Sequence, residues 1–313
     1  MRKADANKFL FRFLLFFSGL FLTCVFSGCV SNAASAEEYY SIGMAYYDLG
    51  KYDEAEKWLN RARQSDRTMS ASTYTLGRLA YERQNYEEAA KYFESILKID
   101  PNNTLALKAA AYSRIMTGEL DKAEKHYSKL FELVPESADD GYNHALVLYA
   151  MEKYSASLEV LEKYPIALQE GKDVMLLYAR NQAALNDIKA IDSYASFLAS
   201  HSDPKARYEY AKILEKHDLY ARALEEYKKA LTETSSSTTT DLKKSDVRFS
   251  LARVLLIADS SSSEGITELR GSVADGFDDI AAVEDLLNKV SASNRDAVRS
   301  IITELKTKSE DNP

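Results

Sequence analysis

The chain has 313 residues, of which 46% are hydrophobic and 28% are charged, and its formal net charge is −8. Eleven Gly and five Pro are too few for a disordered chain or a β-sandwich, so the composition favours helices around a sizeable core. The acidic balance, without a long basic run in the mature part, argues against nucleic acid as a partner.

The first 28 residues have the pattern of a bacterial export signal. A basic start, MRKADANKFLFR, precedes an uncharged apolar run from Phe13 to Phe26 and then the small residues of SGC. The run is shorter than the roughly 20 apolar residues that a transmembrane helix needs. We therefore predict that residues 1–28 are a cleaved signal peptide, with an uncleaved anchor as the alternative.

Cys29 closes this segment in the sequence VFSGC, which resembles a bacterial lipobox. The resemblance implies that Cys29 becomes the acylated first residue of the mature protein, carrying palmitate, although Phe26 stands where Leu is common. An ordinary small residue is the alternative role for Cys29. Residues 29–36 would then form a short tether on the periplasmic side, and Val30, which is not Asp, favours the outer membrane over the inner one.

The rest of the chain repeats itself at intervals of about 34 residues. GMAYYDLGKYDEAEKWL (43–59) returns as GRLAYERQNYEEAAKYF (77–93), and each copy has the pattern of a helix, a turn and a helix. Small residues recur where two helices must approach closely. These packing positions are Gly43, Ala55, Gly77, Ala89, Ala111, Ala123, Ala145, Ala179, Ala211 and Ala223.

This period and pattern resemble the tetratricopeptide repeat (TPR) family. The resemblance implies an all-α, right-handed helix–turn–helix solenoid of about six to seven repeats over residues 36–276, in which stacked neighbours cover each other's apolar faces. We expect a polar insertion at 234–245. Two amphipathic helices in residues 277–313 would cap the C-terminal end of the solenoid. The repeats are predicted at 36–69, 70–103, 104–137, 138–171, 172–203, 204–234 and 245–276.

In TPR proteins the first helices of the repeats line a concave groove. Three Tyr pairs on these helices are spaced by seven residues, so each pair shares one helix face. Tyr and basic side chains suit a protein segment, but each Tyr could instead pack in the core. The chaperone-type clamp of two Lys and two Asn is not present. The positions assigned to the groove are Tyr40, Tyr47, Tyr74, Arg78, Tyr81, Lys108, Tyr112, Tyr142, Asn143, Tyr149, Arg180, Tyr208, Lys212 and Arg253.

We find no pattern that indicates catalysis. The four His residues share no metal-ligand spacing, there is no Gly-rich phosphate loop, and the mature chain would hold no second thiol. We therefore expect no enzymatic activity, no cofactor and no metal. The sequence predicts a membrane-tethered scaffold that binds an envelope protein during assembly, secretion or transport. The alternative is a partner subunit of a periplasmic solute-transport system with a ligand-binding pore or cleft.

Overall fold

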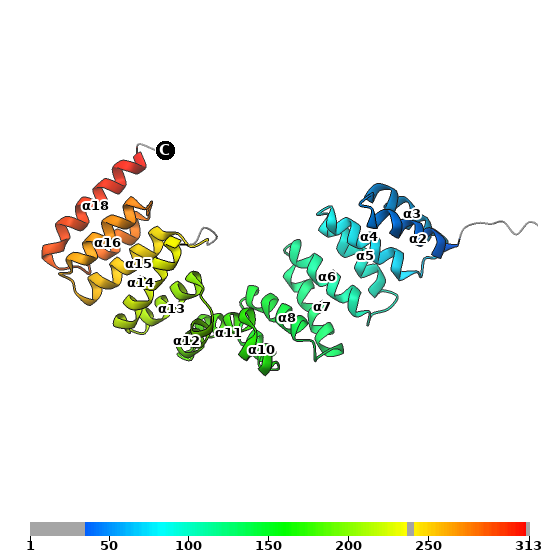
Figure 1. The fold of residues 1–313 in the computed structure, drawn as a ribbon, viewed down its shortest axis with the longest axis horizontal. Helices are drawn as coiled ribbons and strands as arrows, with labels where there is room; N and C mark the ends of the chain where they lie inside the picture. Colours follow the sequence, from blue (N-terminus) through cyan, green and yellow to red (C-terminus); the bar gives the residue numbers. More distant parts are fainter. Residues whose placement is uncertain (1–34, 237–240, 311–313) are drawn as a thin grey trace, which may run out of the picture. The chain divides into compact units, whose positions relative to one another are not determined.

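A computed structural model of the chain describes residues 35–236 and 241–310. Within these ranges the chain is helical and contains no strand, which confirms the predicted all-α class (Figure 1). The fold divides into two compact units, residues 1–117 and 118–313. The signal peptide, Cys29 and most of the tether predicted from the sequence lie outside the described residues.

The first unit is built from paired helices that follow the predicted repeats. Each helix packs against the next one along the chain, as expected for a solenoid. Its helices are α2 (Ala36–Asp48), α3 (Tyr52–Ser65), α4 (Ser70–Glu82), α5 (Tyr86–Leu97) and α6 (Thr104–Met116).

In the second unit two short helices stand where a single one was expected in the fourth repeat. The helices are α7 (Leu120–Leu133), α8 (Ala138–Ala150), α9 (Tyr154–Leu161), α10 (Pro165–Glu170), α11 (Lys172–Ala184), α12 (Ala190–Ser200), α13 (Pro204–Lys216), α14 (Tyr220–Ser236), α15 (Lys244–Ala258), α16 (Ser263–Ala274), α17 (Ile280–Leu287) and α18 (Ala292–Glu310). Most neighbouring helices of this unit also pack in chain order, but α9 packs on α11 and α16 packs on α18.

The ten small packing residues are all buried, and the eight alanines among them are 0% exposed. A Cβ atom added at Gly77 would lie 2.6 Å from Cε1 of Phe93 on α5. One added at Gly43 would lie 2.8 Å from Cγ of Leu59 on α3. These distances are too short for any real Cβ, so in these two helix pairs only a hydrogen fits at the crossing.

The turn that follows each first helix also repeats. Six residues adopt left-handed backbone with φ between 57° and 76°, and their spacing is 34 residues with a last interval of 32. Only two of them are glycine, although left-handed backbone strains other residues. They are Gly50, Gln84, Gly118, Glu152, Asn186 and Asp218.

The fourth repeat departs from the plain helix–turn–helix pattern at Pro165. Proline has no amide hydrogen and disfavours helical backbone in the residue before it. Tyr164 accordingly leaves the helical region, and α9 ends before it while α10 begins after it. Its side chain packs against Gly141, and its hydroxyl donates a hydrogen bond to the carbonyl of Pro135 at 2.9 Å.

The predicted polar insertion at 234–245 is partly helical. α14 continues through Ser236 and α15 begins at Lys244, while Thr234 and Ser245 are buried. Beyond this point α17 and α18 share one apolar cluster with α15 and α16. It includes Phe249, Leu269, Val283, Leu286, Val298 and Ile301. The last two helices thus cover the apolar side of the preceding pair.

Candidate functional site: an aromatic face on the first helices

The first helices of the first unit, α2, α4 and α6, carry seven of the residues assigned to the groove. Arg78, Lys108 and Tyr112 are exposed, and the other four are half-buried. None of the seven belongs to the fully buried core. They are Tyr40, Tyr47, Tyr74, Arg78, Tyr81, Lys108 and Tyr112.

Two ring contacts connect these three helices. The guanidinium of Arg78 on α4 lies over the ring of Tyr47 on α2, 4.9 Å from its centroid. Tyr81 on α4 contacts Tyr112 on α6 with ring centroids 5.7 Å apart. Cation–π and tilted aromatic contacts of this kind contribute on the order of 1 kcal/mol each. The side chains therefore form one continuous surface over successive repeats.

The second helix of each pair supports this surface from the side. Tyr52, the first residue of α3, packs on Tyr47 with centroids 5.6 Å apart. Tyr86, the first residue of α5, packs edge-on against Tyr81 at 5.0 Å. Tyr47 and Tyr81 thus each have one packed side and one accessible side, so each can both pack and bind.

Burial also sets the ionisation of these rings. Desolvation raises the pKa of Tyr81 to about 12, and the neighbouring Tyr112 adds to the shift. The Tyr47 pKa is raised by burial as well, although the charge of Arg78 opposes that shift. The hydroxyls are therefore neutral near pH 7 and can both donate and accept hydrogen bonds.

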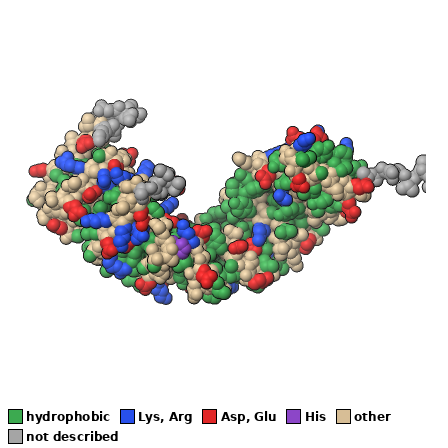
Figure 2. Space-filling view, in the orientation of Figure 1, with side chains coloured by type: hydrophobic (Ala, Val, Ile, Leu, Met, Phe, Trp, Pro, Cys, Tyr) green, Lys and Arg blue, Asp and Glu red, His purple; other side chains and the backbone are tan. Residues whose placement is uncertain are grey.

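Apolar side chains on α6 extend the surface. Leu105 is 64% exposed, Tyr112 49% and Met116 43%, and their spacing of seven and four residues puts them on one helix face. The sequence analysis missed Leu105 and Met116, although their spacing from Tyr112 could have indicated them. We call Tyr47, Arg78, Tyr81, Tyr112, Leu105 and Met116 the aromatic face. Figure 2 shows hydrophobic side chains gathered over this unit.

In the second unit the corresponding arginines are bound to carboxylates of the same unit. Arg180 on α11 makes a two-pronged ion pair with Glu209 on α13, at 2.9 and 3.0 Å. Arg253 on α15 pairs in the same way with Glu215 on α13, at 2.8 Å for both contacts. In this unit both arginines assigned to the groove thus have a carboxylate partner.

Buried tyrosines complete these ion pairs. The Tyr194 hydroxyl donates to Glu209 at 3.0 Å, and the Tyr227 hydroxyl donates to Glu215 at 2.9 Å. Each Glu carboxylate thus accepts hydrogen bonds from an Arg guanidinium and from a Tyr hydroxyl of the same unit. The charges of Arg180 and Arg253 are therefore neutralised within this unit.

The other groove positions of the second unit also contact their neighbours. Tyr149 packs edge-on against Tyr154 with centroids 5.4 Å apart. Tyr208 shares a hydrogen bond of 3.0 Å with Ser250, and the exposed Lys212 lies over the Tyr208 ring at 5.6 Å. Tyr142 and Asn143 are half-buried on α8.

The histidines give no sign of a metal or catalytic centre. His144 is 5% exposed, lies beside Tyr127 and Phe131, and approaches Glu124 at 3.6 Å. Burial lowers the pKa of His144, so the ring stays neutral near pH 7. Within the described ranges, no three His, Cys, Asp or Glu side chains are grouped to hold a metal ion. In the same ranges, no helix combines the length and apolarity needed to cross a bilayer.

Comparison with known proteins identifies the class. Models of the family described as tetratricopeptide repeat match residues 33–102, 80–146 and 189–238. The chain belongs to the tetratricopeptide-repeat proteins.

A curated relative is 27% identical over 165 residues, which is 53% of this chain and 84% of the relative. It is called an uncharacterized lipoprotein and comes from Treponema pallidum (strain Nichols).

Solved structures share the fold. A tetratricopeptide repeat protein from Parabacteroides merdae superposes with a TM-score of 0.55 and 18% identity, over 81% of this chain and 97% of its own. YrrB, described as a TPR protein with an unusual peptide-binding site, superposes with a TM-score of 0.50 and 16% identity, over 56% of this chain and 91% of its own.

Proposed function

We propose that this chain is a membrane-tethered, periplasmic TPR scaffold, and that its aromatic face binds a segment of a partner protein. The observation that carries the proposal is the continuous surface formed by Tyr47, Arg78, Tyr81 and Tyr112 across three successive first helices. Large, rigid aromatic side chains give contact area at a low cost in conformational entropy. The description of YrrB as a peptide-binding TPR protein is consistent with this role.

The chemistry of the face indicates the kind of segment it takes. Exposed Leu105 and Met116 beside Tyr112 favour apolar side chains at one end of the segment. At the other end, Arg78 on Tyr47 favours an acidic or aromatic side chain. The bound segment should therefore combine an apolar anchor with an acidic or aromatic residue. Arg180 has no part in this recognition because Glu209 already holds it.

The decisive test is Tyr81→Ala combined with Tyr112→Ala in the full chain. These changes remove the contact between α4 and α6 and the centre of the face. Truncating a central interface Tyr costs about 2 kcal/mol or more, which is roughly thirtyfold in affinity. A photo-crosslinkable residue in place of Met116 should mark one envelope protein when Tyr81 and Tyr112 are present, and this product should disappear in the double variant.

A matched control removes two tyrosines elsewhere. Tyr178→Ala with Tyr220→Ala lies in the second unit, where both rings are half-buried. This control should keep the crosslinked product, and circular dichroism should show folded helices in both variants. Loss of the product in the control, or its persistence in the folded Tyr81 and Tyr112 variant, would contradict the proposal.

A further inference from the structure

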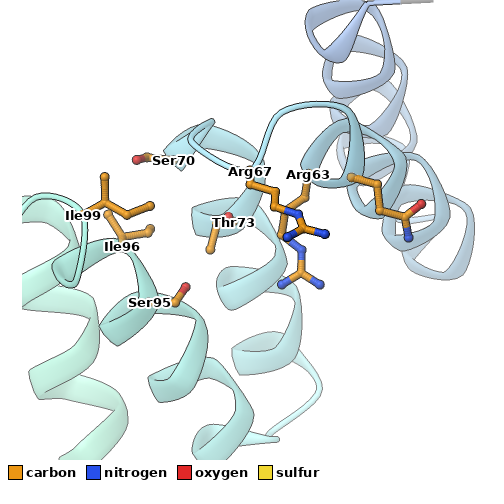
Figure 3. Close-up of a pocket in the computed structure, with 8 residues that line it drawn as sticks. Arg63, Arg67, Ser70, Thr73, Ser95, Ile96 and Ile99 are labelled. Carbon is orange, nitrogen blue, oxygen red and sulfur yellow. The ribbon is translucent and has the colours of Figure 1, made fainter.

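A separate pocket of about 390 Å³ lies in the first unit, between the end of α3, the start of α4 and the end of α5 (Figure 3). It shares no residue with the aromatic face. Basic, hydroxyl and aliphatic side chains line it. They include Arg63, Arg67, Ser70, Thr73, Ile96 and Ile99.

Two arginines of this pocket have no carboxylate partner among the described residues. Arg63 contacts only neutral groups, the ring of Tyr92 at 5.4 Å and the side-chain oxygen of Asn60 at 3.4 Å. Arg67 is exposed and forms no ion pair or hydrogen bond with the described part of the chain. In Figure 3 both guanidinium groups extend to the same side of the pocket.

Two other arginines of the same unit do have carboxylate partners. Arg83 binds Asp53 and Glu56, and Arg114 binds Glu87 and Glu94. Two like charges in one pocket repel each other unless an anion lies between them. The chain has a net charge of −8, so carboxylates are plentiful. None of the described carboxylates pairs with Arg63 or Arg67.

Thr73 gives an independent indication of a ligand. Its side chain lines the pocket, the residue is only 6% exposed, and it forms no hydrogen bond with any described residue. The hydroxyl oxygen is accessible from the pocket, so it can bond to a ligand there. In Figure 3 Thr73 lies between the arginines and the two isoleucines.

The start of α4 adds further donors. Ser70 is its first residue, and the preceding Met69 offers no side-chain cap to the amides of the first turn. Unpaired amides at a helix start favour negative charge. The pocket therefore combines two guanidiniums, two hydroxyls and the positive end of a helix.

We propose that this pocket binds a phosphate group, either as free phosphate or as the headgroup of a phospholipid. A phosphate, with at least three acceptor oxygens and up to two negative charges, suits two guanidinium groups and a hydroxyl better than a carboxylate with two oxygens and one charge. Ile96 and Ile99, which is 58% exposed, provide an apolar rim for whatever carries the phosphate.

The test measures phosphate binding by titration calorimetry on the detergent-solubilised full chain. Arg63→Gln with Arg67→Gln should weaken the binding of inorganic phosphate at least tenfold, because both charge-assisted contacts are lost. Thr73→Val, which keeps the shape and removes the hydroxyl, should weaken it several-fold. Phosphate should also raise the melting temperature of the unmodified chain and not that of the arginine variant.

A control on the same helix removes two charges outside the pocket. Lys57→Gln with Arg61→Gln should bind phosphate as the unmodified chain does, because Lys57 pairs with Glu54 and Arg61 lies over Trp58. Melting curves without ligand should show that all variants fold. The arginine variant also relieves repulsion between two cations, so early melting is not expected from it.

A second titration distinguishes the two sources of phosphate. Dihexanoyl phosphatidylglycerol, used as dispersed single molecules, should bind tighter than inorganic phosphate if a lipid headgroup is the ligand. Equal or weaker binding would assign the site to free phosphate. The proposal is overturned if phosphate does not bind, if the control loses as much affinity as the arginine variant, or if succinate binds as tightly as phosphate.

Discussion

Gly77 lies at the closest approach of α4 and α5, where a single hydrogen separates the backbone from the ring of Phe93. Phe93 is 2% exposed and belongs to an apolar cluster with Ala80, Ala89 and Ala110. The ring cannot withdraw without opening that cluster, because protein interiors are close-packed. The glycine is thus fixed by packing, since its backbone has ordinary helical geometry.

Gly77→Leu should therefore destabilise the first unit. Overpacking of a buried crossing costs about 1–3 kcal/mol or more. Ala71→Leu on the exposed side of the same helix is the matched control and should change stability by about 0.5 kcal/mol or less. Urea denaturation followed by circular dichroism would measure both. An unchanged midpoint for Gly77→Leu would mean that the two helices are farther apart than described.

At the scale of the element, the geometry of a helix pair depends on the turn between the helices as well as on the point where they cross. Gln84 holds the same left-handed backbone as Gly50, with φ of 60° and 70°. Left-handed backbone costs a residue with a side chain about 1–2 kcal/mol relative to glycine. The turn persists at Gln84, Glu152 and Asp218 because helix packing on both sides requires it.

Gln84→Gly should stabilise the chain by about 0.5–1 kcal/mol, since relief of the strained turn outweighs the greater freedom of unfolded glycine. The reciprocal change, Gly50→Ala, should destabilise by a similar amount. A Cβ at Gly50 meets no atom within 4 Å, so its effect would come from the backbone alone. Thermal and urea melts of both variants test the pair, and shifts of the same sign would contradict this account of the turn.

Ion pairs between neighbouring repeats are the second feature of the elements. Arg83 at the end of α4 reaches back to Glu56 on α3, and Arg114 near the end of α6 reaches back to Glu87 on α5. Both partners are 27 residues apart in sequence. The Arg114 side chain is 4% exposed, so its two carboxylates compensate a nearly buried charge. These bonds fix one pair of helices against the next.

At the scale of the whole molecule, the predicted anchor at Cys29 would decide where the surfaces of the chain work. The sequence before Ala36 predicts lipidation of Cys29, and a curated relative is called an uncharacterized lipoprotein. Within the described ranges no helix is fit to cross a bilayer. Attachment would then depend on the acyl chains at Cys29 and on the short stretch that follows it.

Cys29→Ser should release the chain from the membrane fraction. The unmodified protein, expressed in its native envelope, should enter the detergent phase on phase partitioning and incorporate labelled palmitate. The variant should do neither, because its hydroxyl cannot take the thioether-linked lipid. Ser27→Ala, which keeps the small residue before the cut, is the control and should behave like the unmodified protein. Identical partitioning of the Cys29 variant would contradict lipidation.

The sequence determined the helix pairs because the contacts that define them are local. A small residue on each helix and a period near 34 residues follow from two helices that cross closely and stack on their own copies. The helix boundaries therefore agree with the predicted repeats from α2 to α8. Pro165 also indicates the helix break between α9 and α10, but the 34-residue period alone does not predict that break.

Only the tertiary structure decided which charges remain available. Arg180 and Arg78 occupy the same place in their repeats, yet Arg180 is bound by Glu209, which lies 29 residues further on. Likewise Arg63, Arg67 and Thr73 meet in one pocket although they lie on different segments. Side-chain pairing between neighbouring repeats depends on reach and direction in space. The sequence period specifies where the backbone of each repeat lies, but it does not specify how far or in which direction a side chain extends.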